Sequence, residues 1–226
     1  MYRDSSGKTL GDYPRPSVAV DTAVLTVGPS GTLDVLLVRR DSAHRGDAWG
    51  LPGTFLHKGE RLADAVLRSL DEKAGLRGTA TPRQLHVFDD PERDDRGWVL
   101  SVAHVLVLPW RTLAPVLEAH PDDDRLCPVT QATGLPFDHD EIVRMAVSKV
   151  RALYRDRPDP NGLLPSPFTM RQLRHLHAAV AGVEHLQPDA FRRLMEPQLH
   201  DTGRTTAGGV GRPAALYLRP FAASGD

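Results

Sequence analysis

Residues 49–76, with the sequence WGLPGTFLHKGERLADAVLRSLDEKAGL, decide the fold of this chain. The first half is a turn punctuated by glycine and proline, and the second half has the apolar spacing of an amphipathic helix. This spacing assigns the following side chains to the buried face of the helix: Ala63, Val66, Leu67, Leu70 and Ala74. The pattern therefore predicts a loop that is pinned against a helix.

This stretch resembles the Nudix box, in which a glycine loop leads through a fixed spacing to a Glu. A helix reading Arg-Glu-apolar-x-Glu-Glu-x-Gly-apolar follows in that family. The positions that keep the pattern are Glu60, Arg68, Leu70, Glu72, Gly75 and Leu76. Thr54 replaces the second glycine of the loop, Ser69 replaces the first helical Glu, and Lys73 replaces the last one.

The replaced residues are metal ligands in an intact box. Its three helical acids, at i, i+3 and i+4, share one helix face and together hold Mg²⁺. Here Glu72 is the one that remains, and an ammonium at Lys73 would repel a cation about 4 Å away by roughly 4 kcal/mol at an effective dielectric near 20. We therefore expect a ligand pocket without catalytic residues and without a metal or other cofactor. Lys73 is a candidate to hold a diphosphate in place of the metal, and a solvent-facing Lys73 is the alternative.

Composition indicates an ordinary soluble protein. The chain has 226 residues, of which 40% are hydrophobic and 25% charged, enough for one or two domains. Neither a membrane-spanning apolar run nor the apolar core of a signal peptide is apparent, so we expect a cytoplasmic protein without membrane contact. A single cysteine, Cys127, excludes an intrachain disulfide and a cysteine-based zinc site.

Charge is unevenly distributed although the net charge is only −1. From residue 168 onward the chain has seven Arg, no Lys and five acidic residues. Arginine suits bidentate contacts with phosphate or guanine. A GC-rich genome would produce the same preference for Arg over Lys, so both explanations stay open.

Residues 16–155 read as one domain after a loose tail at 1–15. The β-branched segments Ser17–Val27 and Leu33–Arg39 predict two strands of a hairpin, joined by a Gly-Pro-Ser-Gly turn. Arg83–Phe88 and residues 98–108 predict two further strands, the second buried on both faces. Residues 138–155 predict a helix whose inward side chains are Ile142, Met145, Ala146, Val150 and Leu153. Strands around the box helix, closed by this further helix, make an α/β fold of the α/β/α sandwich type.

Two polar loops supply candidate ligand contacts. Arg39 and Arg40 open a loop that leads to Trp49 at the mouth of the Gly-Pro turn. The loop FDDPERDDRGW at residues 88–98 is more charged than a simple connection needs. Its carboxylates suit ribose hydroxyls and its guanidinium groups suit phosphates. Simple solvation of both loops is the alternative.

The C-terminal segment has a different character. Residues 156–167 carry four prolines and form either a linker or a stiff junction. In the domain at 168–226, Thr169 is a plausible N-cap for a helix at Met170–Ala181, and a second helix begins near Pro188 with Phe191, Leu194 and Met195 on its apolar face. Two short strands, at 199–206 and 214–219, flank a glycine-rich tip. The arrangement predicts a winged helix-turn-helix, and an ordinary β-hairpin is the alternative for the strands.

A Nudix-like domain with a damaged box, followed by a winged helix, resembles the Nudix-related transcriptional regulators of NAD metabolism, the NrtR-like family. The resemblance covers residues 17–218. It rests also on LPG-x-F at 51–55, the FDDPERDDRG loop, LPFDHDEI at 135–142, FT-x-x-QL at 168–173, FRR at 191–193 and GRPAALY at 211–217.

The resemblance implies a homodimeric repressor that binds a palindromic double-stranded operator and releases it when ADP-ribose or a related nucleotide occupies the pocket. The ligand contacts that it implies are Arg39, Arg40, Trp49, Glu60, Arg68, Glu72, Lys73, Asp90, Arg93 and Arg96. The DNA contacts that it implies are Thr169, Arg171, Gln172, Arg192, Arg193, Arg204 and Arg212.

Two other functions stay open at this point. One is a Mg²⁺-dependent Nudix hydrolase of ADP-ribose or a related nucleoside diphosphate derivative, with Asp94 or Asp95 replacing the lost acids. The other is an inactive Nudix module for protein–protein contact, with a C-terminal dimerisation element. Release of AMP and ribose 5-phosphate from ADP-ribose would identify the hydrolase. Absence of DNA binding at low salt would favour the protein–protein module.

Overall fold

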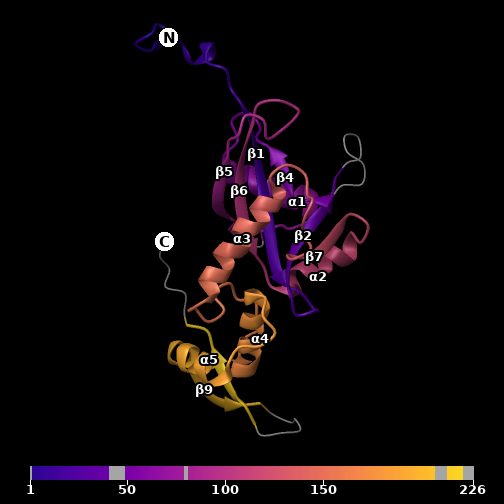
Figure 1. Ribbon diagram of the computed structural model, residues 1–226, viewed down its shortest axis with the longest axis vertical. Helices are drawn as coiled ribbons and strands as arrows, with labels where there is room; N and C mark the ends of the chain where they lie inside the picture. Colours follow the sequence, from indigo (N-terminus) through magenta and orange to yellow (C-terminus); the bar gives the residue numbers. More distant parts are fainter. Residues whose placement is uncertain (1, 41–48, 79–80, 207–212, 221–226) are drawn as a thin grey trace.

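The computed structural model describes residues 2–40, 49–78, 81–206 and 213–220 (Figure 1). After a short 3-10 helix η1 (Leu10–Asp12), the N-terminal part is a mixed sheet with three α-helices. Its elements are β1 (Ser17–Val27), β2 (Leu33–Arg39), β3 (Trp49–Gly50), β4 (Gly53–Phe55), α1 (Leu62–Ala74), β5 (Arg83–Phe88), β6 (Val99–Val107), α2 (Trp110–Ala119), β7 (Asp124–Pro128) and α3 (His139–Tyr154). No helix in these ranges combines the length and apolar character needed to cross a bilayer.

Strand β1 is the centre of the sheet. It runs antiparallel to β2 and parallel to β6, in the order β3-β2-β1-β6-β5, while β4 pairs with β1 and β7 with β2. Ala23 and Leu25 pack in the core that includes α3, whereas Val20 and Val24 pack in the core of α1 and α2. Because successive side chains of a strand face opposite sides, burial on both sides requires a continuous apolar run. The α/β/α sandwich is confirmed.

The predicted bounds of β1, β2 and β5 are those of the structure, and the predictions for β6 and α3 differ by one residue at each end. The structure adds the short strands β3 and β4 in the stretch that reads as a turn, and it also adds α2 and β7, which the sequence does not predict. Pro115 lies inside α2, and a proline usually argues against a helix interior. These two elements extend the sandwich between β6 and α3.

For α1 and α3, the buried face is rotated around the helix axis relative to the predicted one. On α1 the prediction of Ala63 and Leu67 as buried is wrong, because Leu67 is 43% exposed and the sheet covers Ala65 and Ser69 instead. On α3, Met145 and Leu153 are only half-buried, and the full burial falls on neighbouring positions. Those positions are Val143, Val147 and Tyr154. A helix rotated by one position keeps its period of 3.6, so the spacing alone does not decide the phase.

The C-terminal part is a small winged helix. Its elements are β8 (Phe168–Thr169), α4 (Met170–Ala181), α5 (Pro188–Met195), the 3-10 helix η2 (Glu196–Gln198), β9 (His200–Thr205) and β10 (Ala215–Leu218), with strand order β8-β10-β9. Phe168, Leu173, Phe191, Met195 and Tyr217 form its core. The predicted helix-turn-helix and the hairpin after it are confirmed, although Leu194, predicted on the apolar face of α5, is 49% exposed. The tip at 207–212 lies outside the described residues.

Helix α3 packs against both parts of the molecule. Leu176 and Val180 of α4 belong to the same apolar cluster as Val150 and Tyr154 of α3, together with Leu163 of the proline-rich segment. Figure 1 shows α3 reaching from the sheet to the helices of the winged helix. Since well-packed apolar clusters resist separation, the two parts are joined by a common core and not only by the chain between them.

Candidate functional site

Arg68 holds the loop of the box to helix α1. Its guanidinium donates to both carboxylate oxygens of Glu60, at 2.8 and 2.9 Å, and to Thr54 Oγ1 at 3.1 Å and the carbonyl of Phe55 at 2.9 Å. The hydrogen bond from Arg68, with a second from the amide of His57, lowers the pKa of Glu60 to about 2. Thr54, which departs from the box pattern, therefore accepts a hydrogen bond from the same guanidinium group as Glu60.

The other two departures from the box are one turn apart on the same face of α1, but they differ in burial. Ser69 is fully buried, and its hydroxyl has no hydrogen-bond partner among the described atoms, while Lys73 is exposed. Glu72 is 54% exposed, and Arg68 Nη1 lies 3.5 Å from its carboxylate. The described residues include no group of three or more His, Cys, Asp or Glu side chains arranged to hold a metal ion. With Glu60 bound to Arg68, a buried hydroxyl and an ammonium do not make the carboxylate set that Mg²⁺ requires.

A buried polar network lies directly beneath the Gly-Pro turn. The amide of Leu51 donates to His139 Nδ1 at 3.0 Å, so Nε2 carries the proton of the neutral ring and faces Asp21 Oδ1 at 3.4 Å. Ser101 Oγ donates to the other oxygen of Asp21 at 2.5 Å. Burial raises the pKa of Asp21, but hydrogen bonds from His139 and Ser101 and the charge of Arg93 outweigh it, so the pKa is lowered.

This network explains why residue 53 is a glycine, and it joins three elements to the turn. A Cβ at Gly53 would overlap the Asp21 carboxylate, so the turn approaches β1 only because residue 53 has no side chain. Asp21 lies on β1, Ser101 on β6 and His139 at the first position of α3. The start of α3 is thereby fixed to the turn that precedes the box helix.

Arginine and aromatic side chains gather above the network. Arg40 lies 5.0 Å from the ring centroid of Phe137, and Arg96 lies 5.0 Å from the same ring and 5.1 Å from that of Phe55. Arg93, whose side chain is 3% exposed, donates through Nε to Asp138 at 2.5 Å. We name Arg40, Phe55, Arg93, Arg96 and Phe137 the arginine–aromatic cluster. Its residues come from the position after β2, from β4, from the β5–β6 loop and from the segment just before α3.

The structure brings several predicted ligand residues together and leaves others apart. Arg40, Arg93 and Arg96 belong to the arginine–aromatic cluster. Arg68 contacts both Glu60 and Glu72. Trp49 stacks against Arg125 of β7, 4.2 Å from the ring centroid to the guanidinium. Arg39 ends β2, and Asp90 is exposed and accepts from the amide of Glu92. The loop at 41–48, which the sequence analysis includes in the pocket, lies outside the described residues.

Asp94, a candidate replacement acid for metal binding, is committed elsewhere. Its carboxylate accepts from the guanidinium of Arg96 at 2.8 and 2.6 Å, and its side chain is 2% exposed. The hydrogen bond from Arg96 lowers the pKa of Asp94 despite the opposing effect of burial. Asp94 therefore orients Arg96 toward the aromatic rings.

Sequence reasoning missed Asp21, Ser101, Phe137, Asp138 and His139 as site residues. Asp21 had a usable signal, because an acid in the middle of an apolar strand is costly unless it has partners. Phe137 had a weaker one, because it is an aromatic residue directly before the polar run Asp138–Glu141. The partners of these residues are distant in sequence, so their proximity follows from the fold alone.

The winged helix uses two of the predicted DNA contacts as a helix cap. Thr169 Oγ1 accepts from the amide of Gln172 at 3.2 Å, and Gln172 Oε1 accepts from the amide of Thr169 at 2.8 Å. This capping box leaves the first turn of α4 without an acid and with Arg171 exposed on it. A helix N-terminus of this kind favours an anion such as a DNA phosphate.

The remaining predicted DNA contacts differ in how they are held. Arg192 pairs with Glu196 at 2.9 and 2.7 Å, and Glu196 also accepts from the hydroxyl of Tyr217 at 2.6 Å. Arg193 on the same helix and Arg204 on β9 are exposed, and neither makes an ion pair within the described ranges. Arg212 lies outside the described residues. Arg193 and Arg204, like the exposed Arg171, therefore have charges that are available to phosphates.

Asp159 is the hub of the proline-rich junction. It is fully buried and accepts from the amides of Leu163 at 2.7 Å and Leu164 at 3.0 Å, from the hydroxyl of Tyr154 at 3.2 Å and from Arg219 at 2.7 Å. These donors come from α3, from the junction itself and from the residue after β10. Arg219, one of the seven arginines of the C-terminal segment, is thus a structural residue.

The histidine beside this hub is neutral. His177 of α4 packs at a steep angle between Tyr154 and Phe191, with ring centroids 5.1 Å away on each side. Burial lowers the pKa of His177 to about 4, so at neutral pH its Nε2 is free to accept from the amide of Asp159 at 3.4 Å. The junction therefore connects α3, α4 and the end of β10 through buried polar contacts.

Comparison with known proteins identifies two domains. The family model of the NUDIX domain matches residues 17–146, and that of the NrtR DNA-binding winged helix domain matches residues 160–218. A curated relative described as the ADPR responsive transcriptional repressor NtrR of Acinetobacter baylyi is 29% identical over 212 residues, which cover 91% of this chain and 83% of that protein. An ADP-ribose pyrophosphatase of Methanocaldococcus jannaschii is 30% identical over 135 residues, 58% of this chain and 73% of that protein.

Solved structures give the same picture. The crystal structure of Shewanella oneidensis NrtR in complex with a 27mer DNA has a TM-score of 0.73 and 31% identity, and the match covers 89% of this chain and 93% of that one. The NUDIX domain of the same Shewanella protein, solved with ADP ribose, has a TM-score of 0.53 and 25% identity, with 64% and 95% of the two chains covered.

Proposed function

Because this chain belongs to the NrtR-like family of Nudix regulators, we propose that it is a transcriptional repressor of NAD-metabolism genes that releases double-stranded DNA when its Nudix domain binds ADP-ribose or a related nucleotide. It acts as a homodimer on a palindromic operator, whose half-sites are then spaced by about one helical turn or a multiple of it. The Acinetobacter and Shewanella relatives, with their ADPR response and their complexes with DNA and ADP ribose, support this proposal.

The observation that carries the proposal is the position of α3. Its first residue, His139, belongs to the network beneath the box turn, and its last, Tyr154, packs with α4 and donates to Asp159. One 16-residue helix therefore begins at the ligand-binding end and ends at the DNA-binding domain. A helix of that length spans about 24 Å at 1.5 Å per residue.

The arginine–aromatic cluster gives the ligand a way to act on α3. The diphosphate of ADP-ribose is an acceptor for guanidinium groups, and the aromatic rings suit stacking on adenine. A ligand anion that binds Arg93 and Arg96 competes with Asp138 and Asp94 for them. Because Asp138 directly precedes α3, this exchange of partners changes how the start of the helix is held. Lys73, exposed on α1, remains a candidate second contact to the diphosphate.

A gel shift with the DNA upstream of the gene for this chain tests the proposal. We expect a shifted band at low salt that weakens as salt rises, since phosphate contacts dominate such binding. ADP-ribose should release the band at lower concentration than NAD or nicotinamide mononucleotide. Absence of a shift with a folded protein at low salt would refute the repressor and favour a protein–protein module.

Hydrolysis is the second candidate, because the archaeal relative is described as an ADP-ribose pyrophosphatase. The donor set of this chain does not fit a magnesium centre, since Ser69 and Lys73 occupy two of its positions. We therefore expect no release of AMP from ADP-ribose with Mg²⁺, and ADP-ribose affinity that EDTA does not change. Rapid Mg²⁺-dependent turnover by the purified chain would reverse this assignment.

A further inference from the structure

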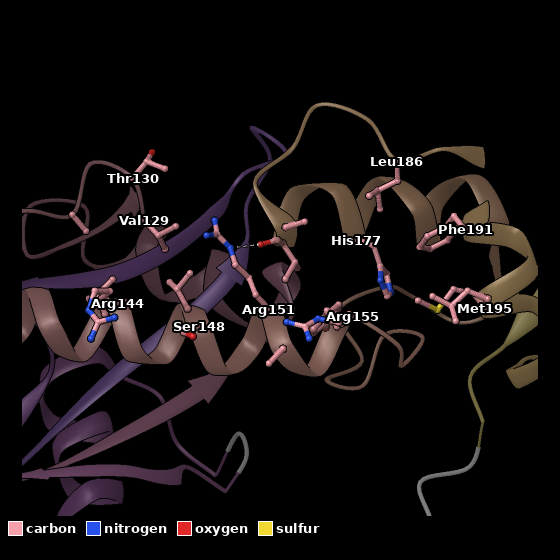
Figure 2. A pocket seen from close by; sticks show the side chains of 18 of the residues that line it. Val129, Thr130, Arg144, Ser148, Arg151, Arg155, His177, Leu186, Phe191 and Met195 are labelled. Carbon is pink, nitrogen blue, oxygen red and sulfur yellow. Dashed lines mark hydrogen bonds between the residues drawn. The ribbon is translucent and has the colours of Figure 1, made fainter. Parts of the chain in front are cut away.

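A cavity of about 1180 Å³ lies where α3 meets α4, α5 and the Val129–Thr133 segment (Figure 2). Drug-sized ligands occupy pockets of roughly 300–1,000 Å³, so this one is large enough for such a molecule. Its lining runs along α3 from Asp140 to Arg155 and includes no residue of the arginine–aromatic cluster, of the box or of the network around His139. The cavity is therefore separate from the proposed effector site.

Most of the wall is apolar and comes from both domains. Val143 and Val147 of α3 line the cavity together with Val180 of α4 and with Phe191 and Met195 of α5. Figure 2 shows Phe191 and Met195 on the winged-helix side and Ser148 on the opposite side. Apolar surface at a boundary between domains is the usual setting of a small-molecule site.

The carboxylates of the wall are already engaged. Asp140 accepts from the amides of Gly134 and Leu135, both at 2.8 Å. Glu141 forms a bidentate pair with Arg144. Neither carboxylate is therefore free to neutralise another cation or to attract a cationic ligand.

Two arginines of the wall have no carboxylate partner among the described residues. Arg151 Nε donates to the carbonyl of Val180 at 3.0 Å, which is the dashed line in Figure 2. The two terminal nitrogens of Arg151 can therefore still donate to a ligand. Arg155, one turn further along α3, is exposed and also lines the cavity. Two guanidinium groups from residues one turn apart, beside an apolar wall, are suited to a ligand that combines an apolar body with an anionic end.

We propose that this cavity is a second ligand site, for a small molecule with an apolar body that ends in a carboxylate, phosphate or sulfonate. Arg151 and Arg155 bind the anionic end, and the valines together with Phe191 and Met195 enclose the body. The effect on DNA rests on the proposed repressor function. Because the walls belong to α3 and α5, a ligand that prefers one arrangement of these helices shifts the affinity for DNA by that preference.

Anilinonaphthalene sulfonate, an aromatic body with one sulfonate, is the probe that tests the site on the full chain. We expect a saturable fluorescence increase with about one probe per chain. Arg155→Ala should weaken the affinity about threefold to tenfold, because an exposed charge-assisted contact is lost. Ser148→Trp, at an exposed position on α3, should fill the cavity and abolish saturable binding. Arg111→Ala, an exposed arginine on α2, is the matched control and should leave binding unchanged.

Three results would overturn the second site. The first is unchanged probe affinity in Ser148→Trp with a native melting curve. The second is full displacement of the probe by ADP-ribose, which would assign the probe to the effector pocket. The third is a change in molecular mass in Ser148→Trp, which would assign the cavity to contact with a second copy of the chain. Failure to bind DNA would refute the repressor but leave the probe measurements intact.

Discussion

Asp159→Asn is the sharpest test of how the two domains are joined. Asp159 has a φ of 46°, a conformation that Asn tolerates as well as Asp, so the substitution keeps the backbone and removes the charge. It leaves one acceptor oxygen where the carboxylate has two, which take four hydrogen bonds. The new amide group faces at least one donor, and Arg219 loses its ionic partner.

The cost follows from the burial of this pair. Removing one member of a buried ion pair costs about 3–5 kcal/mol, because the other charge stays desolvated. Asp159 is fully buried, whereas the side chain of Arg219 is 26% exposed and still donates to the carbonyl of Leu164 at 2.9 Å. We therefore expect the lower end, about 3 kcal/mol of unfolding free energy, which is a large part of the roughly 5–15 kcal/mol that domains have.

Urea unfolding, gel shift and ADP-ribose titration together check this prediction. Asp159→Asn should be less stable and bind DNA more weakly, while its affinity for ADP-ribose stays the same because the cluster lies at the other end of α3. Asp156→Asn, at an exposed neighbouring position, is the control and should change stability by less than about 0.5 kcal/mol. A double-mutant cycle with Arg219→Gln should give a coupling of at least about 1 kcal/mol. A loss below about 1 kcal/mol in Asp159→Asn, or no coupling, would refute the role of the hub.

Three further predictions concern other parts of the molecule. Arg68→Ala should raise the Kd for ADP-ribose at least about tenfold while DNA binding persists, because the loop of the box loses four hydrogen bonds; calorimetric titration measures it. Arg193→Ala should weaken DNA binding alike for all sequences and lower the slope of log affinity against log salt by about 1. Burial raises the pKa of Asp124 to about 6. Between pH 3.8, the ordinary pKa of this carboxyl, and pH 6, Asp124 keeps its proton in the native state and releases it in the unfolded state, so stability falls as pH rises. Asp124→Asn should therefore stabilise the protein by about 1–2 kcal/mol at pH 7 but not at pH 3.5, as urea unfolding at the two pH values would measure.

The strands and the capped helix α4 could be predicted because local chemistry decides them. Ser17–Val27 is β-branched and bounded by turn residues, and Thr169 with Gln172 is a local capping pair. By contrast, α2 contains a proline, and the phase of α1 depends on which side the sheet lies. Those features follow from tertiary packing, which overrides local preference.

The candidate site was only partly predictable for a related reason. Arg68 and Glu60 have a fixed spacing in the box, so their pairing can be expected from the sequence. Asp21, Ser101 and His139 come together from positions separated by up to 118 residues along the chain, the interval from 21 to 139. A single acid on an apolar strand indicates that partners exist, but the topology of the sheet decides which side chains they are.

For ligand binding to affect the DNA-binding domain, deforming the junction must cost more free energy than the ligand provides as coupling. In the proposed mechanism, ligand binding near the start of α3 provides a coupling free energy of typically 1–3 kcal/mol. If the junction deformed at a smaller cost, the exchange of partners around Arg93 would only rearrange the region near Tyr154. The position of α4 would then stay the same. The ion pair of Asp159 with Arg219 and the apolar cluster that α3 shares with Leu176 and Val180 resist such yielding. It follows that Asp159→Asn should reduce the response to ADP-ribose more than it reduces DNA affinity, and that the ratio of DNA affinities with and without ADP-ribose measures the stiffness of the junction directly.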